Sequence, residues 1–206
     1  MHEDTARSTL PRGYVRTLRQ PEELPLLRDH LLRLDPHSRH DRFNGFLDDS
    51  FIESYAAKCA DDGTLIVAYI EGGVVRGAAE LHPPGQSPDG LPEIAFSVEA
   101  SVRRRGVGSS LFQRLIAEAR WKGYSALRIT TGAQNDAMRA LANKFGARLA
   151  FRHGESTGTI DLEPQSQLEL AKLAIAASAD SLRAAASLNR AYWKMVLRIY
   201  GWGRPA

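Results

Sequence analysis

The chain lacks the features that mark several classes of protein. It has a single cysteine, Cys59, among 206 residues, so it cannot form an internal disulfide, and this usage is typical of a reducing, cytoplasmic compartment. No segment approaches the ~18 consecutive apolar residues that a membrane-spanning helix needs, and the first residues have no apolar signal core. The net charge is only +3, and the 27 basic residues are spread along the chain, which argues against a nucleic-acid partner. We therefore expect a cytoplasmic protein with no membrane span.

The composition favours one folded domain with additions at its ends. Hydrophobic residues make up 43% of the chain and charged residues 25%, which is typical of a globular protein with one sizeable core. We expect residues 1–12 to form a flexible leader and residues 13–163 to form the domain. Residues 164–206 are rich in alanine, leucine and serine, so they predict a C-terminal helical extension.

Hydrophobic periodicity within 13–163 predicts a mixture of strands and helices. Strands are expected at 13–19, 64–73, 74–84, 93–98, 125–133, 147–153 and 156–162. Helices are expected at 21–34, 48–60, 110–123 and 135–146, with a loop at 35–45. Gly72 and Gly73 suit a hairpin turn, and Gly123 suits a helix end. This order predicts an α/β (α+β) layer architecture.

The stretch "SVRRRGVGSS" at 101–110 stands out from its surroundings. Three adjacent arginines repel one another, and glycines weaken a regular element. A glycine loop between a strand and a helix binds phosphate, because its backbone N–H groups and the helix N-terminus both attract anions. A solvated turn is the alternative. The loop is neither a Rossmann fingerprint, which needs glycine in place of Leu111, nor a P-loop, which needs Gly-Lys-Ser or Gly-Lys-Thr.

The spacing Arg103-x-x-Gly106-x-Gly108 resembles the loop of the Gcn5-related N-acetyltransferase (GNAT) family that binds the pyrophosphate of acetyl-CoA. Three further features are similar to that family: a strand that ends at Val98, Asn135 at the start of a helix, and "NKFGARL" at its end. The motif spacing most resembles the GNAT module of bacterial protein-lysine acetyltransferases. The resemblance implies a mixed, mostly antiparallel sheet of six to seven strands, flanked by helices and splayed between its fourth and fifth strands.

The resemblance also implies acetyl-CoA as cosubstrate and a set of residues that hold it. The splay would free Ser97, Val98 and Glu99 for the thioester and pantetheine, with Asn135 near the pantetheine arm. The pyrophosphate loop would comprise Arg103, Arg104, Arg105, Gly106, Val107, Gly108 and Ser109. No metal is expected, because His37 and His40 lack cysteine or carboxylate partners at ligand spacing.

Acetyl transfer to an amine requires a neutral nucleophile, and an alkylammonium group has a pKa of about 10.4. A general base is therefore useful, and Glu93 resembles the family's catalytic glutamate; the alternative is an exposed carboxylate at a strand end. Many members carry a tyrosine as general acid where this chain has Ala142. The expected activity is direct acetyl transfer in a ternary complex to a primary amine, either a protein lysine or a small molecule. The alternative is a non-catalytic acyl-CoA-binding regulatory module.

Two further expectations concern charge and burial. Acidic side chains near the acceptor pocket could attract a cationic amine, although acidic residues at a helix start more often serve as caps. These side chains are Asp48, Asp49, Glu53 and Glu80. The extension carries too many apolar residues to leave in water, and its aromatics favour interfaces. A homodimer through the extension, or packing on the core, is favoured over a membrane surface.

Overall fold

The computed structural model describes residues 13–45, 47–85, 89–152 and 154–162. The expected leader and C-terminal extension lie outside these residues. The helices are α1 (Leu24–Leu32), α2 (Pro36–Phe43), α3 (Asp49–Asp61), α4 (Val107–Trp121) and α5 (Asp136–Lys144), with a short 3-10 turn, η1 (Ala100–Val102). The strands are β1 (Tyr14–Thr17), β2 (Leu65–Glu71), β3 (Val74–His82), β4 (Glu93–Val98), β5 (Ala126–Gly132), β6 (Arg148–Arg152) and β7 (Glu155–Asp161).

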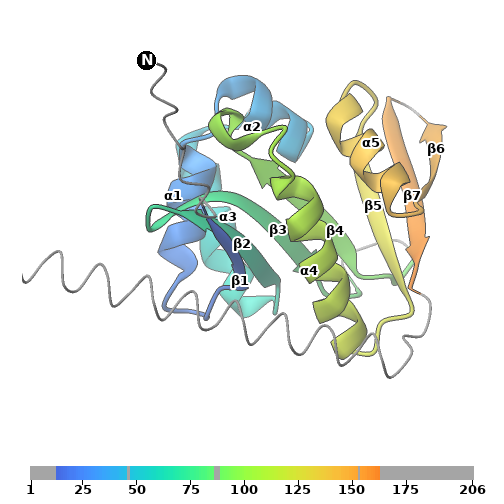
Figure 1. Ribbon diagram of the computed structural model, residues 1–206, viewed down its shortest axis with the longest axis horizontal. Coiled ribbons are helices and arrows are strands. Elements are labelled where there is room, and N and C mark those ends of the chain that lie inside the picture. The colour runs from blue at the N-terminus through green and yellow to red at the C-terminus, as the bar shows by residue number, and fades with distance from the viewer. Residues whose placement is uncertain (1–12, 46, 86–88, 153, 163–206) are drawn as a thin grey trace, which may run out of the picture.

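The strands form one seven-stranded sheet in the order β1-β2-β3-β4-β5-β7-β6. Neighbouring strands are antiparallel except β4 and β5, which are parallel and pair only at Glu93↔Arg128 and Ile94↔Ile129. Beyond Ile94 the two strands diverge, and Figure 1 shows β5, β7 and β6 set apart from the rest of the sheet. The predicted mixed sheet, splayed between its fourth and fifth strands, is confirmed.

Helices cover both faces of the sheet. On one face α1 and α3 bury Leu27, Leu31 and Ile52 against the side chains of β2 and β3. On the other face α4 lies across the centre of the sheet (Figure 1). Its apolar stripe, which contains Leu111 and Leu115, packs into the core there. Each amphipathic helix has one apolar face to bury, and the sheet offers one such surface on each side.

The expected loop at 35–45 is wrong, because most of it forms α2. Asp35 caps this helix by accepting a hydrogen bond from the Ser38 N–H at 2.9 Å. Pro36 occupies the first turn, where its missing N–H costs nothing, and Asn44 ends the helix with a left-handed φ of 53°. The sequence signal was present: Asp-Pro ends one helix and begins the next.

The helix after the arginines also begins earlier than expected. Gly106, with φ +80°, is the N-cap residue of α4, and Val107 is its first residue. Gly108 therefore lies in the first helical turn rather than in a loop. The Gly72-Gly73 turn and the end of α4 before Gly123 are as predicted, with φ values of 62°, 82° and 84°. Within the described ranges, no helix is long and apolar enough to cross a membrane.

Candidate active site

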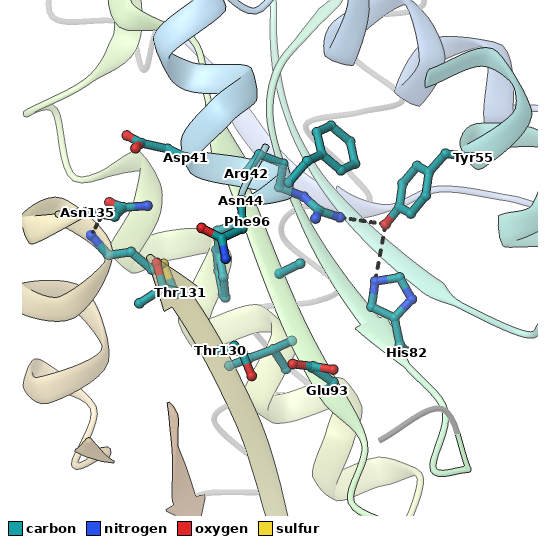
Figure 2. Close-up of a pocket in the computed structure, with 14 residues that line it drawn as sticks. Asp41, Arg42, Asn44, Tyr55, His82, Glu93, Phe96, Thr130, Thr131 and Asn135 are labelled. Carbon is teal, nitrogen blue, oxygen red and sulfur yellow. Dashed lines mark hydrogen bonds between the residues drawn. The ribbon is translucent and has the colours of Figure 1, made fainter. Parts of the chain in front are cut away.

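A cavity of about 330 Å³ lies where β4 and β5 diverge. Figure 2 shows polar side chains that line it, which come from α2, α3, β3, β4 and β5 and from the ends of α2 and α5. The lining residues are Asp41, Arg42, Phe43, Asn44, Tyr55, His82, Glu93, Ile94, Ala95, Phe96, Thr130, Thr131, Asn135 and Met138. Successive residues of a strand point to opposite faces of a sheet. Because consecutive residues of β4 and of β5 all line it, the cavity reaches both faces of the sheet through the gap.

The lining of the cavity differs in polarity between the two faces of the sheet. Glu93 lies on the α2/α3 face, since its cross-strand partner His82 is close to Tyr55 of α3. Phe96 lies on the α4/α5 face, where its ring stacks on Phe112 at 4.9 Å. The α2/α3 face is charged and polar, and the α4/α5 face is mostly apolar.

The N-terminus of α4 lies on that apolar face and is open to an anion. Among the described residues no side chain caps α4, and the same is true of α1, whereas α2, α3 and α5 are capped by Asp35, Asp48 and Asn135. Uncapped N–H groups and the helix dipole attract an anion. Gly108 packs closely here: a Cβ on it would lie 3.3 Å from Leu141 Cδ2 of α5.

The three adjacent arginines point to three different places. The Arg103 guanidinium donates to the Val98 carbonyl at 3.0 Å and to Ser38 Oγ at 2.6 Å, so it ties β4 to α2. Arg105 forms an ion pair with Glu71 at 2.9 Å. Arg104 is exposed and has a positive φ of 59°. Arg104 is therefore the arginine of this group whose side chain is best placed to meet an anion at the helix N-terminus.

The backbone of β4 shows which of its groups face the gap. The Glu99 N–H donates to the Arg76 carbonyl at 2.9 Å, and in an antiparallel pair the direction alternates at every residue. Ser97 and Glu99 therefore direct their backbone groups toward β3, while Phe96 and Val98 direct theirs toward the gap. The expectation that Ser97 and Glu99 face the gap is wrong. Val98 does face it, and Phe96 was missed because periodicity alone does not identify the partner strand.

The side chains of Ser97 and Glu99 serve a buried cluster instead. His30, which is fully buried, contacts Ser97 Oγ at 2.9 Å and Glu99 Oε1 at 3.3 Å. The Glu99 carboxylate also pairs with Arg33 at 3.0 Å and Arg76 at 2.7 Å. Burial alone would raise the pKa of Glu99, but its bonds to His30 and Arg76 outweigh burial and lower the pKa to about 2. This cluster fixes α1 against β4.

A second buried cluster lies beneath the α2/α3 side of the cavity. Glu80 is fully buried and pairs with Arg42 at 2.9 Å, and it also accepts a hydrogen bond from the Tyr55 hydroxyl. Burial alone would raise the pKa of Glu80, but Arg42 and its other partners hold it below the ordinary value. The expectation that Glu80 attracts a cationic substrate is wrong, because Arg42 neutralises it. Asp48 is the cap of α3 and accepts from the Phe51 N–H at 2.8 Å.

His82 joins this cluster to the cavity wall. Its Nε2 lies 3.2 Å from the Tyr55 hydroxyl (Figure 2). Its Nδ1 lies 3.0 Å from Thr64 Oγ1. Burial lowers the pKa of His82, despite the opposing influence of Glu80. Sequence reasoning missed Tyr55 and His82, since no motif connects α3 with β3.

Glu93 and Asn135 lie on opposite sides of the cavity, whereas Ala142 and Cys59 are buried. Glu93 lines the cavity with its side chain 31% exposed, 3.9 Å from Arg128 Nε. Asn135 lines the opposite side and uses its Oδ1 to cap α5, accepting from the Met138 N–H at 3.0 Å. Ala142 is fully buried in the core. Cys59 is buried, and burial raises the pKa of its thiol to about 12, so it is no nucleophile.

The chain is similar to known acetyltransferases. It matches the Acetyltransferase (GNAT) family over residues 27–147. The GNAT domain of PAT from S. lividans superposes with a TM-score of 0.61 at 20% identity, over 73% of this chain and 90% of that one. The putative acetyltransferase YncA from Salmonella typhimurium, solved with its cofactor acetyl-CoA, gives 0.54 at 18% identity, over 75% and 96%. The ribosomal-protein-S18-alanine N-acetyltransferase from Escherichia coli gives 0.55 at 16% identity, over 75% and 97%.

The sheet opens beside the N-terminus of α4, which no side chain among the described residues caps. The chain belongs to the GNAT family and is an N-acetyltransferase. Members use acetyl-CoA, and the residues present fit it: the uncapped amides of α4 suit a pyrophosphate, and the gap beside Phe96 and Val98 suits an extended pantetheine arm. Among the residues that the structure describes, no group of three or more His, Cys, Asp or Glu side chains is placed to hold a metal.

Proposed function

We propose that the protein transfers the acetyl group of acetyl-CoA directly to a primary amine while both substrates are bound. The observation that supports this most is the cavity that joins the two faces of the sheet. Coenzyme A would lie on the α4/α5 face, and the amine would enter from the α2/α3 face. The thioester would then meet the amine in the gap between β4 and β5.

The proposed roles follow from this placement. The backbone amides from Arg104 to Ser109 would bind the pyrophosphate, and the N–H groups of Phe96 and Val98 would hydrogen-bond the pantetheine and thioester. Glu93 would accept the proton of the amine, because it lies on the acceptor side with its carboxylate partly exposed. Asn135 would flank the pantetheine arm.

The acceptor we propose is a cationic amine, either a protein lysine or a small molecule. Asp41 and Glu93 are the acidic residues of the cavity lining, while Arg42 is already neutralised by Glu80 at 2.9 Å. Glu93 lies 3.9 Å from Arg128, a longer separation than that between Arg42 and Glu80. Acidic residues in the lining attract an alkylammonium group and repel an anionic acceptor. We also propose a cytoplasmic enzyme that self-associates through residues 164–206, on the basis of the apolar and aromatic content of that segment.

Binding of acetyl-CoA to the α4 N-terminus is tested by calorimetry on Arg104→Glu. This change reverses a charge beside the amides without disturbing a buried side chain, and we expect at least a tenfold loss of affinity. Lys122→Glu is the matched control, since it makes the same charge change at the other end of α4, roughly 22 Å away. Equal affinity of both variants and the parent would contradict the placement of the pyrophosphate.

Turnover is tested by release of coenzyme A thiol with amines of different charge. We expect thiol release with lysine peptides or polyamines and none above background with anionic acceptors. Tight binding of acetyl-CoA without thiol release for any amine would instead favour the regulatory binding module.

A further inference from the structure

The Thr131 hydroxyl is a buried polar group with no use inside the protein. Thr131 is 5% exposed, and its Oγ1 finds no hydrogen-bond partner among the residues that the structure describes. Buried hydroxyls are almost always hydrogen-bonded, and leaving one unpaired is unfavourable. A valine would fill the same space without that cost, so the hydroxyl requires an explanation.

The position of Thr131 indicates where its partner must come from. Thr131 lines the cavity (Figure 2), and in β5 it shares a face with Leu127 and Ile129, which lie in the core beneath α4. It therefore lies on the α4/α5 face, near Asn135 and Met138 at the start of α5. The partner is a group that enters the cavity from the coenzyme A side.

We propose that the Thr131 hydroxyl donates a hydrogen bond to the sulfur of coenzyme A as it leaves, and this rests on the proposed acetyl transfer. In that reaction the amine nitrogen forms a bond to the carbonyl carbon, the carbon–sulfur bond breaks, and its electron pair stays on sulfur. The amine proton goes to the base on the α2/α3 face, and Thr131 keeps its own. A hydrogen bond from a hydroxyl to an anion is stronger than one to a neutral acceptor. The hydrogen bond from Thr131 therefore strengthens as the sulfur becomes a thiolate.

The other groups of the cavity are less suited to this task. Asn135 has a donor in its Nδ2, but it is only partly buried, and its side chain is oriented by the cap of α5, where Oδ1 accepts from the Met138 N–H. Ala142 has no donor. The titratable and charged groups of the lining lie on the α2/α3 face; they are Asp41, Arg42, Tyr55, His82 and Glu93. Thr130 is the neighbouring hydroxyl of β5, but it faces the acceptor side.

The test compares the binding of coenzyme A with that of desulfo-coenzyme A, which lacks the titrating thiol. The thiol has a pKa of ~8.5 by analogy with cysteine, so coenzyme A becomes a thiolate as the pH rises from 7 to 10, whereas desulfo-coenzyme A does not change there. The quantity to follow is the affinity for coenzyme A divided by the affinity for desulfo-coenzyme A. We expect this ratio to rise about tenfold in the parent and in Thr131→Ser. It should stay flat in Thr131→Val, whose thermal midpoint should be unchanged or higher. Thr130→Val is the matched control and should keep the rise.

Each contrary outcome has a distinct meaning. If the ratio is flat in the parent, or rises equally in Thr131→Val, the hydroxyl does not contact the thiolate. If Thr131→Val weakens acetyl-CoA but leaves the ratio rising, the hydroxyl serves the carbonyl and the assignment to sulfur is wrong. If neither ligand binds the parent, the proposed function fails and this inference fails with it.

Discussion

The buried ion pair between Arg42 and Glu80 should be the most costly polar contact to break near the cavity. Glu80 is fully buried, the Arg42 side chain is 8% exposed, and their charged atoms are 2.9 Å apart. Arg42 also lies over the Phe43 and Tyr55 rings at 4.7 and 5.3 Å. Removing Arg42 leaves the Glu80 carboxylate buried without its close cationic partner, and breaking a buried pair in this way costs about 3–5 kcal/mol.

Arg42→Met therefore should lower the free energy of unfolding by about 3–5 kcal/mol, a large part of the 5–15 kcal/mol typical of a domain. If the free energy of unfolding falls by about 2 kcal/mol per M of urea, the urea concentration at the midpoint of unfolding should fall by about 2 M. The double variant Arg42→Met/Glu80→Met should be more stable than Arg42→Met alone, because it removes the uncompensated carboxylate.

Arg114→Met provides the matched control for urea unfolding followed by circular dichroism. Arg114 pairs with Glu118 one turn along α4 at 2.8 Å, with side chains 25% and 19% exposed, so this pair is more accessible to water than Arg42 and Glu80. Such an i,i+4 pair contributes less than about 1 kcal/mol. If Arg42→Met costs no more than Arg114→Met, or if the double variant is no better than Arg42→Met, burial does not determine the strength of this pair.

Four further changes test the proposed base, two buried residues and the C-terminal segment. Glu93→Gln should lower kcat by about 10²–10⁴-fold at neutral pH with nearly unchanged acetyl-CoA affinity; turnover within twofold of the parent would exclude Glu93 as the base. The pKa of Glu99 is lowered to about 2, so its contribution of at most about 3 kcal/mol is present above pH 4.5 and lost as the pH falls toward 2. The stability difference between the parent and Glu99→Gln in urea should therefore shrink over that range, and a constant difference would contradict the assignment. Ala142→Tyr should destabilise the fully buried site by at least about 1–3 kcal/mol without raising thiol release. Deleting 164–206 should alter the oligomeric state, which light scattering gives as the measured molar mass divided by the mass of one chain; if both chains are equally soluble monomers, self-association through that segment is excluded.

Local chemistry was sufficient to predict much of the fold. Hydrophobic periodicity correctly predicted the strands and most of the helices of an α/β layer architecture, and the resemblance to the family correctly implied that the sheet is mixed. Turn and cap residues such as Gly123 and Asp48 marked element ends, because their preferences depend on neighbouring backbone alone. The spacing of Arg103, Gly106 and Gly108 predicted the family that the comparison shows. Asp35-Pro36 was misread because the same dipeptide ends one helix and begins another.

The contacts of the site were decided by the tertiary structure. A period of two does not tell which neighbour a strand residue bonds, so the choice of Phe96 over Ser97 depends on the pairing of β4 with β3. The Arg103 guanidinium donates a hydrogen bond to Ser38, which lies 65 positions earlier in the chain, and so points away from the N-terminus of α4. The cluster of Arg42, Tyr55 and Glu80 brings together three elements with no shared motif. Such groups meet because burying the apolar faces of the helices fixes where each helix lies on the sheet, and only that placement determines which polar side chains must satisfy one another.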